Sequence, residues 1–203
     1  MNVQEHFWLT NSKDYVTENS EFDLNAGLRA WNKILSKIPK ECIHSILDCG
    51  SNIGRNINFL NNVLPFASKN IIEISPEAYS VVTTKYQISE TFLGPIKNAQ
   101  FSGTFDLVFS SGVLIHVHPD ELLQTISRIY HLSNKYVLII EYFSRSPQMI
   151  EYRGQKNLLF KQDFGKLLLE HYSLKVLDYG FLWGVEYDDA GFDDMTYWLF
   201  EKQ

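Results

Sequence analysis

Residues 44–56, HSILDCGSNIGRN, join a short apolar run to a glycine-containing turn and then to the start of a helical pattern. Ile46 and Leu47 predict a buried strand that ends at Asp48. Gly50 permits a tight turn, and the helix that follows leaves backbone N–H groups unpaired at its N-terminus. The stretch therefore predicts a strand–turn–helix unit with a ligand site at the carboxyl end of its strand.

The rest of the chain alternates between apolar runs and helical patterns, which predicts a mostly parallel sheet with helices on both faces. The last two runs are separated only by VEYDDAGFDD, residues 185–194, so a hairpin-like connection and one antiparallel strand are expected. The predicted strands are 44–50, 70–74, 90–94, 105–111, 135–143, 173–184 and 195–202, and the predicted helices are 22–38, 53–64, 75–86, 118–132 and 161–172, after a helical lead-in over 6–19.

The bulk composition narrows the class of protein. A chain of 203 residues suits one domain, and its net charge of -6 argues against a nucleic-acid partner, which usually meets a basic face. No apolar run is long enough to span a membrane, and the start has no signal-peptide pattern. Cys42 and Cys49 have no metal-type spacing and are expected to be free thiols. We therefore expect a single cytoplasmic domain.

Two acidic residues help to predict which ligand the glycine-containing turn binds. A dinucleotide fingerprint, G-x-G-x-x-G, requires glycine where this chain has Asn52. Asp48 would repel a pyrophosphate but suits an ammonium, such as that of S-adenosylmethionine. Glu73 ends the second predicted strand, where a carboxylate accepts the ribose hydroxyls of either NAD or S-adenosylmethionine. Asn52 is expected at positive φ. A structural turn and a solvent-exposed acid are the alternatives.

The run FDLVFSSGVLIH, residues 105–116, together with the turn and the closing strands resembles class I S-adenosylmethionine-dependent methyltransferases. The resemblance implies an α/β, Rossmann-like, seven-stranded sheet in the order 3-2-1-4-5-7-6, with N-terminal helices (1–40) that cap a core (41–203). It implies S-adenosyl-L-methionine as the cofactor. The residues expected to bind it are Tyr15, Asn19, Asp48, Gly50, Ser51, Asn52, Gly54, Arg55, Asn56, Glu73, Ile74, Ser75, Gly94, Pro95, Ser110, Ser111 and Gly112.

A closer resemblance covers Phe7 to Lys202. The segments LDCGSNIGRN, EISPEAY, GVLIHVHPDEL, EYFSRSPQMIEYRG, LFKQDFG and DYGFLWG are together similar to the pseudaminic acid biosynthesis-associated methyltransferases. This resemblance implies a small methyltransferase of bacterial surface-sugar pathways. It does not fix the acceptor.

Methyl transfer needs alignment and a dry site, and it needs a base only where the acceptor atom starts protonated. Histidine titrates near neutral pH, so His116 is the first candidate base, with Tyr142 as a second catalytic candidate; a packing role for His116 is the alternative. His116 and His118 form an H-x-H near Asp120, but a metal would need a further ligand, and none is expected. His118 is expected to cap the helix that begins at Pro119.

The segment EYFSRSPQMIEYRG, residues 141–154, is expected to wall the acceptor pocket. Arg145 and Arg153 could pair with a carboxylate or phosphate, as a sugar acid would require, or they are solvated loop residues. The acidic segment 186–194 is a solvated turn, a calcium site or a site for a cationic acceptor. The residues expected to bind the acceptor are Glu141, Arg145, Tyr152, Arg153 and Trp183.

Three classes of function follow from these patterns. The leading one is a small-molecule methyltransferase that acts on oxygen or nitrogen of a sugar or sugar-derived acid, as a monomer or homodimer. The second is a non-catalytic protein of the same fold that binds S-adenosylmethionine. The third is a nicotinamide-dependent oxidoreductase.

Overall fold

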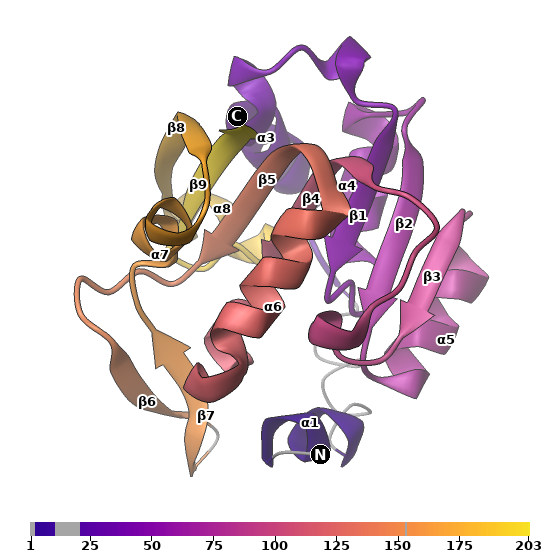
Figure 1. Cartoon of the computed structure of the whole chain (residues 1–203). Helices are drawn as coiled ribbons and strands as arrows, with labels where there is room; N and C mark the ends of the chain where they lie inside the picture. The colour runs from indigo at the N-terminus through magenta and orange to yellow at the C-terminus, as the bar shows by residue number, and fades with distance from the viewer. Residues whose placement is uncertain (1–2, 11–20, 153) are drawn as a thin grey trace.

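The computed structural model describes residues 3–10, 21–152 and 154–203 (Figure 1). Its main sheet has the strand order β3-β2-β1-β4-β5-β9-β8. The strands are β1 (Ser45–Cys49), β2 (Ser68–Glu73), β3 (Glu90–Leu93), β4 (Phe105–Ser111), β5 (Ser133–Glu141), β8 (Leu174–Leu182) and β9 (Met195–Lys202). β9 is antiparallel to both β5 and β8, whereas β1 to β5 pair in parallel. The predicted order is confirmed, because β8 and β9 are the sixth and seventh predicted strands.

Helices cover both faces of this sheet (Figure 1). One hydrophobic cluster joins it to α3 (Leu24–Ile34), α4 (Arg55–Val63) and α5 (Pro76–Lys85). A second cluster joins it to α6 (Pro119–Leu132) and α7 (Phe164–His171). Successive residues of β1 serve opposite faces, since Ile46 belongs to the first cluster and Leu47 to the second. The central strand β1 is therefore apolar on both faces, as a parallel strand between helical layers requires.

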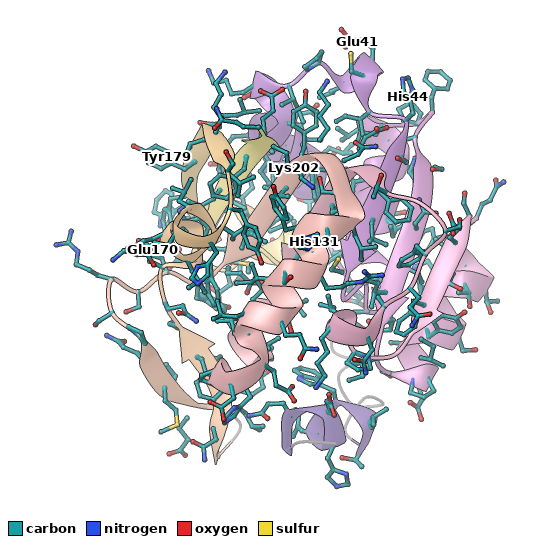
Figure 2. The ribbon with its side chains drawn as sticks, viewed as in Figure 1. Glu41, His44, His131, Glu170, Tyr179 and Lys202 are labelled. Atoms are coloured by element: carbon teal, nitrogen blue, oxygen red, sulfur yellow. The ribbon has the colours of Figure 1, made fainter. Side chains whose placement is uncertain are left out.

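Local sequence signals set where the helices begin. Ser75 caps α5 by accepting a hydrogen bond from the amide of Ala78, with Pro76 in the first turn as predicted. His118 caps α6 and accepts from the amide of Asp120, which confirms its expected role. At the other end of α6, the Lys202 ammonium, labelled in Figure 2, donates to the carbonyls of Tyr130 and Ser133.

A small second sheet was not predicted. It consists of β6 (Gln148–Tyr152) and β7 (Gln155–Lys161), an antiparallel hairpin beside the N-terminal end of α6 (Figure 1). Periodicity did not reveal β6 because four of its five residues are exposed. The connection between β8 and β9 is also richer than a tight hairpin, because it contains α8 (Gly184–Tyr187) and the short helix η5 (Asp188–Ala190).

The N-terminal part contributes two α-helices to the described structure. The predicted helix over 22–38 is α3, followed by the short helix η1 (Leu35–Lys37). The lead-in contains α1 (Val3–Thr10), which lies beyond the carboxyl ends of the parallel strands (Figure 1). Within the described ranges, every helix is too short or too polar to cross a bilayer.

Candidate active site

A cavity opens at the carboxyl ends of the central strands, where ligands bind in open α/β sheets. Segments that follow β1, β2, β3 and β4 form its wall, and α1 contributes a further side. The residues expected to bind the cofactor that line it are Gly50, Ser51, Asn52, Arg55, Asn56, Glu73, Ile74, Ser75, Gly94, Pro95, Ser111 and Gly112. Tyr15 and Asn19 lie outside the described residues. The topology has thus brought four separate predicted segments to one place.

The turn after β1 has a backbone that few residues adopt. Gly50 and Gly54 have φ of 92° and 86°, and Asn52 has φ of 49°, as expected for this Asn. A Cβ on Gly50 would lie 2.5 Å from a methyl of Val113. These close approaches draw the chain tightly across the carboxyl end of β1 and turn it into α4.

Asp48 lies beneath this turn, behind the cavity wall. Its side chain is fully buried, and neither carboxylate oxygen has a hydrogen-bond partner among the described residues. Burial raises the pKa of Asp48 well above its ordinary value, Glu73 raises it further, and Arg55 opposes both. Because buried carboxylates are normally paired, this one fits a cationic group supplied by a ligand.

Glu73 is held rigidly at the end of β2. One carboxylate oxygen accepts from the amide of Asn52 at 2.6 Å and the other from the amide of Ser75 at 2.8 Å. Burial raises the pKa of Glu73, while these backbone hydrogen bonds lower it. An ionised carboxylate has about four lone-pair directions, so Glu73 can still accept from a pair of ligand hydroxyls.

Glu141 and Ser110 stand behind the cavity rather than on its wall. Glu141 is fully buried and accepts from the Ser110 hydroxyl at 2.8 Å and from the amides of Val113 and Leu114 at 3.0 and 2.9 Å. Burial raises its pKa to about 7 against those hydrogen bonds. Glu141 therefore shapes the loop after β4, which carries Ser111 and Gly112 into the cavity. Gly54 also supports from behind, since a Cβ there would lie 2.6 Å from the Tyr86 ring.

His116 lines the cavity at the end of the short helix η4 (Leu114–His116). It is 8% exposed, and its Nδ1 donates to the carbonyl of Leu158 at 2.7 Å. The carbonyl can only accept, so Nδ1 carries the proton and Nε2 of the neutral ring carries the lone pair. Trp8 and Tyr152 pack against the imidazole with ring centroids 4.8 and 5.1 Å away. His116 is thus packed between aromatic rings, and Nε2 is the basic nitrogen of its imidazole.

The remaining residues named for catalysis or acceptor binding are scattered. The Tyr142 hydroxyl donates to Asp193 at 3.3 Å, off the cavity wall. Arg145 is exposed, and Trp183, 55% exposed, precedes α8 away from the cavity. Arg153 lies outside the described residues. In the described part of the chain, no group of three His, Cys, Asp or Glu side chains could hold a metal ion.

Sequence reasoning missed a cluster of charges at the cavity rim. The Lys97 ammonium, on the short helix η3 (Ile96–Asn98), lies 2.8 Å from Glu5 of α1 and 2.6 Å from Glu121 of α6. Burial alone would lower the pKa of Lys97, but its hydrogen bonds to both carboxylates raise it. These three residues are far apart in the chain and belong to no shared motif, so no sequence signal joined them. The cluster ties α1 to the core beside the cavity.

Part of the sequence that forms this cavity matches a known protein family. Residues 47–137 match the methyltransferase domain family. The match indicates an S-adenosylmethionine-dependent methyltransferase. A search of curated proteins gives no match. The family match covers the turn after β1, Glu73 and the segment after β4. S-adenosyl-L-methionine is the cofactor that this match indicates, in agreement with the sequence prediction.

Solved structures share the fold of the methyltransferase. The 1,6-didemethyltoxoflavin-N1-methyltransferase of Burkholderia thailandensis is 16% identical with a TM-score of 0.65, and the match covers 100% of this chain and 92% of that one. Magnesium protoporphyrin IX methyltransferase from Synechocystis PCC 6803, with bound SAM, is 14% identical with a TM-score of 0.65, covering 100% and 99%. The N-methyltransferase of Bradyrhizobium japonicum is 14% identical with a TM-score of 0.63, covering 87% and 85%. These similarities establish a class I methyltransferase fold.

Proposed function

We propose that this methyltransferase holds S-adenosyl-L-methionine in the cavity above Asp48 and methylates a small molecule. The observation that carries the proposal is the buried, unpaired carboxylate of Asp48 beneath a turn of positive-φ residues. A cationic ligand group would satisfy that carboxylate, whereas the pyrophosphate of a dinucleotide would be repelled by it.

The other cavity residues suit the remaining parts of this cofactor. The amides at the start of α4 are the proposed partners of its carboxylate, together with Arg55, which lines the cavity and also donates to the Gly191 carbonyl. Glu73 is the proposed acceptor for the ribose hydroxyls, and Pro95 and Ile96, which line the same cavity, are the proposed apolar wall for the adenine. When bound, the cofactor supplies a methyl group on a positively charged sulfur. Ser111 and Gly112 line the same cavity on the His116 side.

His116 is the proposed base for an acceptor whose oxygen or nitrogen starts protonated. Its Nε2 would take the proton while Nδ1–H stays on the Leu158 carbonyl. Trp8 and Tyr152 keep water from the ring, which favours alignment of the acceptor atom. Tyr142 stays a second candidate at the acceptor side, with its hydroxyl held by Asp193.

For the acceptor we propose a sugar or a sugar-derived acid of bacterial surface-glycan biosynthesis. Support comes from the sequence resemblance to the pseudaminic acid-associated family and from the aromatic ring of Tyr152, which could stack on a sugar face. Arg145 and Arg153 are the proposed carboxylate partners. The names of the similar structures concern other small molecules, 1,6-didemethyltoxoflavin and magnesium protoporphyrin IX.

The proposal also covers the domain organisation, the cellular location and the oligomeric state. Residues 1–203 form one domain in which residues 1–40 cap the core. A net charge of -6 supports an enzyme without a nucleic-acid partner. The free thiols Cys42 and Cys49 support a cytoplasmic location. The enzyme acts as a monomer or a homodimer.

Calorimetric titration with S-adenosylhomocysteine and with NAD tests the proposal. The wild type is expected to bind S-adenosylhomocysteine, and Asp48→Asn to bind it about tenfold or more weakly, because a charged hydrogen bond is lost. Asp120→Asn, which changes an exposed carboxylate on α6, is the matched control. Binding of NAD alone would overturn the proposal.

Turnover separates an enzyme from a non-catalytic binder. With a panel of sugar acids and transfer of a labelled methyl group as the assay, His116→Ala is expected to lower the rate much more than cofactor affinity. Product formed by the wild type supports catalysis. Equal rates for wild type and variant would reduce His116 to a packing residue.

A further inference from the structure

The strand β7 contains a bulge next to the active site. Between the pairs Ile150–Leu159 and Tyr152–Gln155, β6 advances by two residues while β7 advances by four. Within this bulge Asn157 has φ of 66°, a left-handed conformation that is uncommon away from glycine. The neighbours Leu158 and Leu159 are both buried, although successive side chains of a regular strand face opposite ways.

The bulge sends two successive carbonyls into the site. The carbonyl of Asn157 accepts from the side-chain amide of Gln4 on α1 at 2.6 Å. The next carbonyl, of Leu158, accepts from Nδ1 of His116 at 2.7 Å. In a regular strand adjacent carbonyls point in opposite directions, so one kink is needed for both to serve the cavity.

The hydrogen bond between His116 and Leu158 is buried, and the one between Gln4 and Asn157 is partly buried. Gln4 is 4% exposed, His116 8% and Leu158 1%, and both Gln4 and His116 line the cavity. Losing one partner of a buried hydrogen bond costs more than losing an exposed one. The hydrogen bond to His116 therefore stabilises the orientation of the imidazole, and the hydrogen bond to Gln4 stabilises the docking of α1.

We propose that Asn157 is a positioning residue of the methyltransferase. Its left-handed backbone sets the tautomer of His116 through the Leu158 carbonyl and, through its own carbonyl, seats α1 over the cavity. The inference rests on the proposed role of His116 as base. It makes β7 the element that joins the docking of α1 to the tautomer of the base.

Substitutions at Asn157 separate backbone geometry from side-chain chemistry. Valine strongly disfavours positive φ, whereas glycine accepts it. In Asn157→Val we expect the ¹⁵N shifts of the His116 imidazole to show loss of the Nδ1–H tautomer. Amide exchange over residues 3–10 should accelerate about tenfold, and turnover should fall about tenfold. Asn157→Gly should keep the tautomer and the slow exchange of the wild type.

Further variants keep the test decisive. Gln4→Met removes only the hydrogen bond between α1 and the Asn157 carbonyl. Amide exchange over residues 3–10 should therefore accelerate, while His116 keeps its Nδ1–H tautomer. Asp194→Val strains another left-handed residue, φ 49°, away from His116 and should change neither readout. If Asn157→Val does not fold, as judged by circular dichroism, the milder Asn157→Ala takes its place.

The outcomes are separable from those of the proposed function. A folded valine or alanine variant with unchanged tautomer and unchanged exchange would overturn the inference. So would a glycine variant that behaves like the valine variant. Absence of S-adenosylhomocysteine binding in the wild type would instead overturn the proposed function and leave both spectroscopic readouts standing.

Discussion

The two ends of the cavity are built in different ways. At the cofactor end, Asp48 and Glu73 lie on adjacent parallel strands, and one short turn supplies the backbone between them. At the acceptor end, His116 depends on Leu158 and on Trp8, which belong to segments far away in the chain. The first end is thus determined by local backbone geometry and the second by tertiary docking. Changes to each end should have correspondingly different effects.

The largest expected effect concerns the turn at the cofactor end. Gly54→Val would place a β-branched residue at φ 86° with its Cβ 2.6 Å from Tyr86 and 2.7 Å from Val82. We expect a loss of about 3 kcal/mol or more in the free energy of unfolding, from backbone strain and overpacking. Urea titration measures it. Gly103→Ala is the control, because a Cβ at Gly103 meets nothing within 4 Å. Equal stabilities would show that the turn is not the rigid end.

The next effect concerns the loop that joins the two ends. Burial raises the pKa of Glu141 to about 7, above its ordinary 4.5, so the folded state binds the proton more tightly than the unfolded state. The stability from this group is complete below pH 4.5 and is lost as the pH rises toward 7, by about 3 kcal/mol. Glu141→Gln should flatten the stability profile in this window. An unchanged slope in urea titrations from pH 4.5 to 7 would contradict the assignment.

A smaller effect should separate the parts of the cofactor. Glu73→Gln is expected to weaken adenosine and S-adenosylhomocysteine binding about tenfold each, because a charged acceptor for the ribose hydroxyls is lost. Asp48→Asn should weaken S-adenosylhomocysteine but leave adenosine almost unchanged, since adenosine has no ammonium. Calorimetric titration of both ligands checks this. An equal loss of adenosine affinity in both variants would contradict separate roles for Asp48 and Glu73.

The smallest effect belongs to the docking of α1. Lys97→Met removes the ion pairs with Glu5 and Glu121 while keeping the length of the side chain. We expect S-adenosylhomocysteine to dissociate about threefold faster, because partly exposed ion pairs contribute little. Stopped-flow dissociation measures this rate. Lys166→Met, which removes the exposed pair with Glu170, should leave it unchanged.

The sequence predicted the main fold because each element carries a local signal. The run over β5 is continuously apolar, and α5 begins with Ser75 and Pro76. The same holds for the cofactor end, where the residue types of Gly50, Asn52 and Gly54 indicate a backbone with positive φ. Even so, the position of Asp48, buried beneath the turn, needed the structure.

The acceptor end was less predictable for a physical reason. The hairpin of β6 and β7 has few buried positions, and its left-handed residue is Asn157 rather than glycine. Glu141 was expected to face the acceptor, yet it binds backbone amides behind the loop. Such partners depend on how distant segments dock, which periodicity does not report.

The placement of β9 between β5 and β8 has a consequence for synthesis. Chains are made from the amino end, so β8 emerges from the ribosome before the strand that connects it to the sheet. Until β9 arrives, β5 is an open sheet edge and β8 has no place in the ladder. The nascent chain therefore carries an exposed strand edge until β9 has been made, and this edge leaves it open to aggregation and to chaperones.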